Sequence, residues 1–295
     1  MTRAFSIGML ICLGLTLSSA VGCSESTAVR PEPNKELAAT LRSGAGSGAA
    51  GGSAEEAPVS TGTGWGTIKG RFVYAGDPPV LAPLSTGGKD PTVCGANSPN
   101  QSLVVGSDKG IENIVLYVNK APRVFKPEGD APAEETTIPL FDQKGCIFLT
   151  HVMAMQTSDV LKIKNSDSVA HNTSFNPGGR NNSTNPQLPP EGEATYKWQQ
   201  AIATPAEVTC SIHPWMKGYI IARDDPYYAV TKGDGTFEIK NVPAGEELEF
   251  RVWHEKAPTG LEAKPGWSKG RFKVKVPADG VEDLGEIAVP PAAFR

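Results

Sequence analysis

Potential metal ligands are concentrated between Cys210 and Met216, in the sequence Cys-Ser-Ile-His-Pro-Trp-Met. Cys210, His213 and Met216 offer a thiolate, an imidazole and a thioether on one short loop, with the spacing C-x₂-H-x₂-M. His171, which precedes Asn172, supplies a second imidazole. Two His and one Cys in a trigonal plane, with a weak axial Met, are the ligands of blue-copper electron-transfer sites. These residues therefore predict a site for one type 1 copper ion.

The order of the ligands resembles that of the cupredoxins, and of amicyanin-like and plastocyanin-like domains in particular. That family combines an upstream His-Asn with a later C-x₂-H-P-x-M-x-G loop. This chain has His171-Asn172 and then the run from Cys210 to Gly218, and the resemblance covers roughly residues 137–224. It implies a cupredoxin-like Greek-key β-sandwich around the copper ligands.

The resemblance also implies roles for the residues around the ligands. Asn172 would tie the two ligand loops together, and its backbone N–H would donate to the sulfur of Cys210. His213 would expose its ring edge through an apolar patch formed by Pro214 and Trp215, where electrons pass to a docked partner. Weak redox encounters bury little area, so we expect a small docking surface.

The remaining histidines do not suggest an enzyme. The chain has four His residues, and His151 and His254 are too few for the trinuclear centre of a multicopper enzyme. We interpret both as structural or surface residues, and a second metal site that they share is the alternative. Asp167 resembles a catalytic acid in its position near His171, but residues 165–168 (Asn-Ser-Asp-Ser) are typical of an Asx-type turn. We expect no enzymatic activity.

The composition favours an all-β fold. Hydrophobic residues make up 39% of the chain, Gly and Pro number 32 and 25, and no sustained helical apolar period occurs after the N-terminal segment. The net charge of −4 comes without a basic run that could neutralise phosphates, which argues against nucleic acid as a partner.

The N-terminus is typical of an exported bacterial protein. Residues 1–22 combine Arg3 with an apolar run too short for a transmembrane helix and a small-residue end, as in a signal peptide. The following Cys23 completes a lipobox-like sequence and predicts a lipid anchor, although ordinary cleavage after Gly22 also fits. Residues 23–63 are rich in Gly, Ser and Ala and predict a disordered linker. We expect a location in the bacterial cell envelope, periplasmic or on the outer surface, with membrane contact through the anchor only.

Export also accounts for the five cysteines. Cys12 would leave with the signal peptide, Cys23 would carry the lipid, and Cys210 would bind metal. Cys94 and Cys146 remain, and an oxidising compartment favours a disulfide between them. Two separate buried thiols are the alternative.

A second motif lies outside the copper-like region. Residues 231–245 follow the pattern T-x₂-D-G-x-F-x-I-x₂-V-P-x-G, and Gly-x-Ile-x-Gly at 66–70 precedes an apolar run at 114–118. Together these segments resemble a carboxypeptidase regulatory-like β-sandwich. That family opens with a motif like Gly-x-Ile-x-Gly at 66–70, and the pattern at 231–245 belongs to its second half.

The order of the segments suggests a split sandwich. Residues 64–136 and 225–295 would form its two parts, and the cupredoxin-like domain, 137–224, would be inserted between them. Strands from the first part should then pair with strands from the last. Two sandwiches in tandem, joined near 224–226, are the simpler alternative.

Three functions are compatible with these features. The first is electron transfer by one copper ion, with an unidentified redox partner such as a c-type cytochrome. The second is copper holding or delivery without electron transfer. The third is cell-surface adhesion or carbohydrate binding by the second sandwich.

Overall fold

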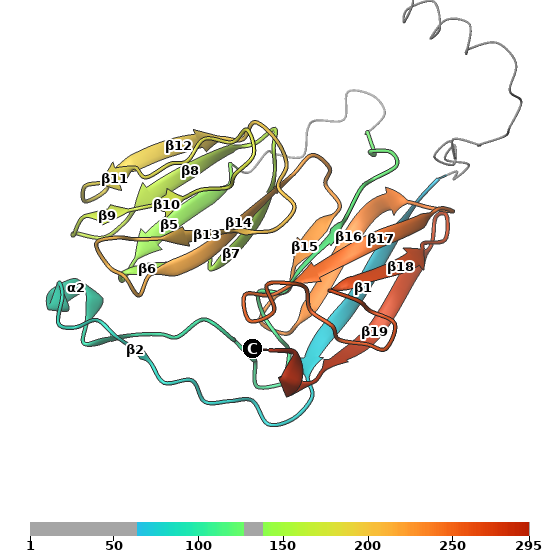
Figure 1. Cartoon of the computed structure of the whole chain (residues 1–295), viewed down its shortest axis with the longest axis horizontal. Coiled ribbons are helices and arrows are strands. Elements are labelled where there is room, and N and C mark those ends of the chain that lie inside the picture. Colours follow the sequence, from blue (N-terminus) through green and yellow to red (C-terminus); the bar gives the residue numbers. More distant parts are fainter. Residues whose placement is uncertain (1–63, 127–137, 295) are drawn as a thin grey trace, which may run out of the picture. The chain divides into compact units, whose positions relative to one another are not determined.

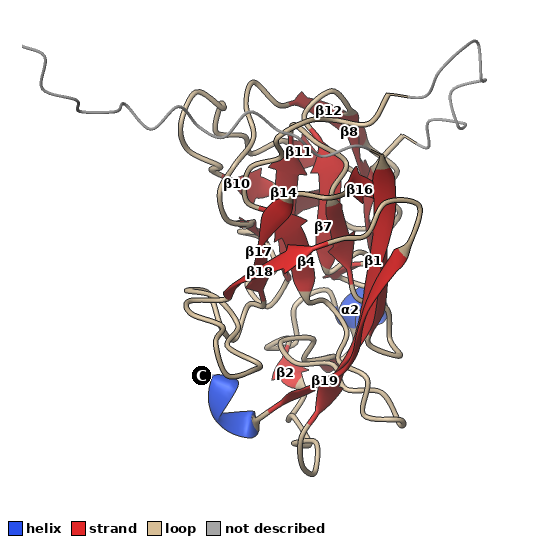
Figure 2. Cartoon of the chain, turned by 90° about the vertical axis from the view of Figure 1, so that its right-hand side faces the viewer, coloured by secondary structure: helices blue, strands red, loops and turns tan. Residues whose placement is uncertain are grey.

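The computed structural model describes residues 64–126 and 138–294. Within these ranges, the regular structure is almost entirely β-strand, as Figure 2 shows. The helices described there are α2 (Pro91–Cys94) and the 3-10 helix η1 (Pro291–Ala293). The all-β class predicted from composition is therefore confirmed.

Two sheets form a first sandwich (Figure 1). One has the strand order β16-β1-β19 and the other has the order β15-β4-β17-β18. Apolar side chains from both sheets meet in one core. The strands are β1 (Trp65–Tyr74), β4 (Val115–Val118), β15 (Tyr228–Val230), β16 (Thr236–Pro243), β17 (Glu247–Trp253), β18 (Arg271–Lys275) and β19 (Val281–Val289).

This sandwich joins strands from distant parts of the sequence. Strand β1 pairs antiparallel with β16 and parallel with β19, and β4 pairs antiparallel with both β15 and β17. These are pairings between early and late segments, of the kind that the split arrangement predicts. The domain boundaries themselves stay a prediction.

A second sandwich contains residues between these segments. Its sheets have the orders β10-β13-β14-β7 and β12-β8-β5-β6, with the short pair β11-β9 beside them. The first sheet holds β7 (Val152–Gln156), β10 (Ser174–Phe175), β13 (Ala206–Thr209) and β14 (Lys217–Arg223). The others hold β5 (Leu140–Lys144), β6 (Ile147–Phe148), β8 (Val160–Asn165), β9 (His171–Asn172), β11 (Gln187–Leu188) and β12 (Glu193–Lys197).

Strand β4 is buried on both faces and belongs to both cores. Leu116 and Val118 pack in the core of the first sandwich, whereas Val115 and Tyr117 pack in the core of the second. Trp253, at the end of β17, also joins the second core. The second core therefore takes side chains from outside residues 137–224.

The segment between β1 and β4 carries a small structure of its own. It contains β2 (Leu84–Ser85), α2 and β3 (Asn97–Ser98), and β2 pairs with β3. The predicted disulfide is present between Cys94, at the end of α2, and Cys146 in the β5–β6 turn. A segment that precedes β4 is thus fixed covalently to the second sandwich.

The predicted signal peptide, the lipidation site at Cys23 and the linker at 23–63 all lie outside the described residues. Among the helices that the structure describes, none has the length and apolar character needed to cross a bilayer.

Candidate metal centre

Two loops of the second sandwich carry the predicted ligands. His171 begins β9, and Cys210, His213 and Met216 lie on the loop between β13 and β14. The latter loop closes on itself, because the N–H of Met216 donates to the carbonyl of His213 (2.9 Å) and the N–H of Cys210 donates to the carbonyl of Met216 (3.4 Å). All four side chains are buried.

The donor atoms of three ligands converge. The Nδ1 atoms of His171 and His213 are 2.9 Å apart. The Sγ atom of Cys210 lies 4.0 Å from Nδ1 of His171 and 3.9 Å from Nδ1 of His213. These three atoms form a buried cluster that could hold one metal ion. Met216 is 1% exposed and closes the same loop.

The surroundings of the sulfur agree with the expectation for Asn172. Its backbone N–H donates to Sγ of Cys210 (3.4 Å), and the N–H of His213 donates to the same sulfur (3.4 Å). The side-chain oxygen of Asn172 accepts the N–H of Ser211 (2.8 Å), which ties the two ligand loops together. Hydrogen bonds to a thiolate reduce its charge density and tune a bound metal.

Asp167 fixes His171 from within the same loop. Its Oδ2 lies 2.8 Å from Nε2 of His171, and its two oxygens accept the N–H groups of Gly145 (2.7 Å) and Cys146 (2.8 Å). The predicted Asx-type turn is present, since Oδ1 of Asn165 accepts the N–H of Asp167 (2.9 Å). Asp167 thus binds His171 and the β5–β6 turn together.

The expectation that His213 exposes its ring edge is wrong. The side chain is 0% exposed, and Oδ2 of Asp90 lies 2.8 Å from its Nε2. Asp90 immediately precedes α2, so the segment between β1 and β4 covers the edge that was expected to face a partner. The spacing of the ligand motif gave no indication that Asp90 covers His213, because the two residues are 123 positions apart in the sequence.

The backbone of Asp90 is unusual. Its φ of 46° and ψ of 52° place a non-glycine residue in the left-handed region, which costs about 1–3 kcal/mol. It occupies the N-cap position of α2, but its side chain makes no capping hydrogen bond. An Asp at this position ordinarily caps its helix. Here the carboxylate contacts His213 instead.

These contacts fit a cation between the two histidines. We assign the proton of each neutral ring to Nε2, where a carboxylate accepts it, which leaves a lone pair on each Nδ1. Two lone pairs 2.9 Å apart repel each other unless a proton or a metal ion lies between them. Burial lowers the pKa of His171, although the hydrogen bond to Asp167 acts in the opposite direction, so a proton is disfavoured there. Buried nitrogen lone pairs beside a thiol suit a soft or borderline metal.

The predicted docking residues line a cavity. Pro214 is exposed and Trp215 is half-buried, and both lie on a cavity of about 870 Å³. The ring of Trp215 packs edge-on against the ring of His213, with centroids 5.1 Å apart, and its Nε1–H donates to the carbonyl of Cys146 (3.1 Å). Met216 also contributes to the cavity wall. Pro214 and Trp215 therefore line a cavity of mixed polar and apolar residues, and their role in docking stays a prediction.

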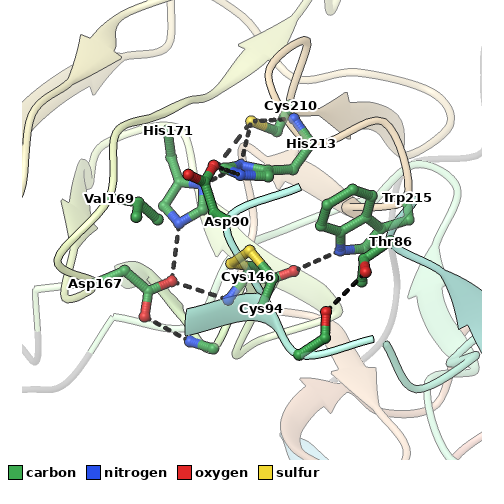
Figure 3. The surroundings of a disulfide bond; sticks show 12 residues. Thr86, Asp90, Cys94, Cys146, Asp167, Val169, His171, Cys210, His213 and Trp215 are labelled. Carbon is green, nitrogen blue, oxygen red and sulfur yellow. Dashed lines mark hydrogen bonds and ion pairs between the residues drawn. A yellow bond between two sulfur atoms is a disulfide. The ribbon is translucent and has the colours of Figure 1, made fainter. Parts of the chain in front are cut away.

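The disulfide lies directly beside this cluster. The sulfurs of Cys94 and Cys146 lie within 4.8 Å of a ring nitrogen of His213. Figure 3 shows the disulfide close to Asp90 and Asp167 and to the two histidines that these carboxylates contact.

The other two histidines are held separately. Nε2 of His151 contacts a carboxylate oxygen of Glu255, and both side chains are buried. Nδ1 of His254 accepts the N–H of Lys256 (3.1 Å), and burial lowers the pKa of His254 to about 3. Neither histidine joins a three-residue metal cluster among the described residues. Their structural interpretation agrees with these contacts.

Sequence reasoning missed the roles of Asp167 and Asp90. The i,i+4 spacing of Asp167 and His171 was a usable signal, because both lie on one short loop. Asp90 offered no local signal. The disulfide partner Cys94, four residues later, was the only sequence feature that connected Asp90 with the ligand loops.

Comparison with known proteins gives limited information. No family model matches the chain. No curated protein matches it either.

Solved structures similar to part of the chain include forms of amicyanin. A reduced Cu(I) form at pH 4 of an amicyanin mutant is 19% identical, with coverage of 33% of this chain and 92% of that chain and a TM-score of 0.27. A reduced form of another mutant is 20% identical and covers 28% of this chain and 80% of that one, with a TM-score of 0.26. An oxidised form of a third mutant is 18% identical, with coverage of 29% of this chain and 82% of that chain and a TM-score of 0.26.

Proposed function

We propose that this protein is an exported copper protein that transfers single electrons at one mononuclear, type 1 site. The observation that carries the proposal is the buried convergence of two Nδ1 lone pairs on the thiol of Cys210. His171, Cys210 and His213 would hold the ion, and Met216 would supply the weak axial ligand. Copper in such a site alternates between Cu(II) and Cu(I) and so accepts and releases one electron.

The protein's own residues prepare this site before any metal arrives. Asp167 and Asp90 orient the two imidazoles, and the N–H groups of Asn172 and His213 stabilise the charge on the sulfur. Complete burial of the donors excludes bulk water. Preorganised ligands need little rearrangement when the charge of the ion changes, which favours electron transfer.

Electron exchange would take place at the cavity beside Trp215. His213 is covered by Asp90, whereas Trp215 contacts the His213 ring and reaches the cavity. Lys89, Lys217 and Lys256 line the same cavity and favour an acidic partner surface. We propose a redox protein such as a c-type cytochrome as this partner.

The remaining parts of the proposal come from the sequence. The signal-like segment and Cys23 support export to the bacterial cell envelope with a lipid anchor. The small number of histidines supports an electron carrier and not a multicopper enzyme, because His151 contacts Glu255 and His254 accepts the N–H of Lys256.

Copper loading of the purified protein tests the proposal. We expect one equivalent of Cu(II) to give intense blue or green absorption and a type 1 spin-resonance spectrum, and Cys210→Ser to lose both. His151→Ala is the control, because His151 is a buried histidine outside the donor cluster and contacts Glu255 instead. A wild-type protein that binds copper without thiolate absorption would refute a type 1 site.

Copper holding is the second candidate, and one observation favours it. His213 is covered completely, and a closed site retains an ion better than an open one. Cyclic voltammetry separates the two functions. A reversible one-electron wave supports electron transfer, whereas tight Cu(I) binding without a reversible wave supports holding or delivery.

A further inference from the structure

In both His171 and His213, Nε2 contacts an Asp carboxylate, and Nδ1 faces the donor cluster (Figure 3). The two carboxylates are nevertheless held in different ways. Asp167 is 5% exposed, lies four residues from His171, and accepts two backbone N–H groups. Asp90 is 38% exposed and lies 123 residues from His213.

The local structure around Asp90 directs its carboxylate toward His213. The carbonyl of Asp90 accepts the N–H groups of Val93 (3.0 Å) and Cys94 (2.9 Å), which fixes the backbone as the start of α2. The side chain does not cap the helix that it begins, and its φ is 46°. A strained backbone that gives up a local hydrogen bond for a distant contact is typical of a functional position.

The disulfide connects the two carboxylates. Cys94 ends the helix that Asp90 begins, and the N–H of Cys146 donates to Asp167. The bond between Cys94 and Cys146 therefore links α2, which follows Asp90, to the β5–β6 turn, which hydrogen-bonds to Asp167.

We propose that Asp90 is a positioning residue for the metal centre and that the Cys94–Cys146 disulfide keeps it in place. Asp90 holds His213 as the Nε2–H tautomer, so that the Nδ1 lone pair points to the metal position. This inference rests on the proposed copper function and adds a residue from outside the cupredoxin-like segment to its site.

The negative charge of Asp90 has a second effect. A carboxylate that accepts the N–H of a ligand imidazole raises the basicity of that ligand. A more basic ligand stabilises Cu(II) more than Cu(I), and so lowers the reduction potential. Removal of the charge should then raise the potential.

Two substitutions separate orientation from charge. Asp90→Asn retains an oxygen that can accept the Nε2–H of His213 but removes the charge. Asp90→Ala removes both. Asp77→Asn is the matched control, because Asp77 is an exposed acid of the same segment and its neutralisation changes the net charge equally.

The first measurement uses the metal-free protein and does not depend on copper. Long-range ¹H–¹⁵N spectra report the tautomer of each histidine ring. We expect His213 to remain the Nε2–H tautomer in Asp90→Asn and Asp77→Asn, and to become a mixture of tautomers in Asp90→Ala. His171 should not change in any of them. A His213 tautomer that is the same in Asp90→Ala and wild type would overturn the positioning role.

The second measurement is the reduction potential of the copper-loaded proteins. Loss of a hydrogen-bond partner of this kind weakens metal affinity by about 10–100-fold. A tenfold loss of Cu(II) affinity relative to Cu(I) raises a one-electron potential by about 59 mV. We expect at least that rise in Asp90→Asn and Asp90→Ala and none in Asp77→Asn. Equal potentials in all four proteins would overturn the effect of charge, whereas failure of wild type to give a type 1 spectrum would refute the copper function and leave the tautomer result valid.

A double variant without the disulfide tests whether that bond keeps Asp90 in place. Cys94→Ala with Cys146→Ala should give His213 the tautomer mixture of Asp90→Ala, while His171 stays fixed by Asp167. If His213 keeps the wild-type tautomer in a folded double variant, the disulfide is not what holds Asp90.

Discussion

The four histidines of the chain form two buried sets that differ in what their nitrogens face. In His171 and His213 the Nε2 atoms contact carboxylates and the Nδ1 atoms lie 2.9 Å apart beside a thiol. In His151, Nε2 contacts Glu255, and in His254, Nδ1 accepts a backbone N–H. Burial is similar in both sets. The candidate metal centre therefore differs from the other two histidines in the convergence of its nitrogen atoms and not in burial.

Removal of one histidine from each set should have opposite consequences. We expect His171→Ala to abolish the thiolate-to-copper absorption. We expect His151→Ala to keep it and to lower the free energy of unfolding by roughly 3–5 kcal/mol, because Glu255 is left buried without its partner. Copper titration and urea unfolding of the metal-free proteins measure the two effects. Loss of copper binding in a folded His151→Ala protein would contradict the comparison.

Acid should destabilise the structural set. Burial, together with the nearby charges of His151 and Lys256, lowers the pKa of His254 to about 3 in the folded protein, against about 6.5 when unfolded. The folded state therefore binds fewer protons, and the stability that His254 contributes above pH 6.5 is lost progressively between about pH 6.5 and 3.

At a pH two units below the pKa of His254 in the unfolded chain, the loss in the free energy of unfolding amounts to about 2.7 kcal/mol. Urea unfolding at neutral pH and near pH 4.5 measures it. His254→Asn, which retains an acceptor for the N–H of Lys256, is the control and should lose less stability in acid. An equal loss in both proteins would assign the acid sensitivity to other groups.

The smallest expected effect concerns Met216, the axial ligand that we propose. We expect Met216→Leu to keep copper and its colour but to raise the reduction potential, because the lost thioether stabilises Cu(II) more than Cu(I). Each tenfold change in relative affinity corresponds to about 59 mV. Voltammetry of the loaded variant measures the shift, and complete loss of copper would show that Met216 is more than a weak ligand.

Local sequence patterns were sufficient for the ligand loop and several strands. Cys210 and His213 lie three residues apart on one loop, so their spacing alone indicated that their donor atoms lie close together. The strand predicted at residues 160–165 has the same limits in the structure, because its apolar residues alternate regularly. Besides several two-residue strands, two of the longer strands were not predicted. The sequence Val-Met-Ala-Met-Gln of β7 lacks β-branched residues beyond the first, and β19 is interrupted by Gly285, which has a φ of 64° at an irregular register.

Long-range contacts were the part that the sequence did not reveal. The resemblance to the cupredoxins implied an exposed ring edge for His213, but the side chain is buried. The covering residue, Asp90, comes from a segment that the sequence indicates only as a loop. Its position depends on α2 and on the disulfide, and both act through tertiary structure. A family resemblance that begins at residue 137 contains no information about this segment.

The position of β1 in its sheet has a consequence for how the chain folds. Both neighbours of β1, the strands β16 and β19, lie more than 160 residues later in the sequence. A strand whose partners are this distant closes a long loop before it gains any pairing, which slows folding. Until then its edges are unpaired, and unpaired edges favour association with other chains. Since β4 contributes side chains to both cores, the second sandwich also remains incomplete until β4 is in place.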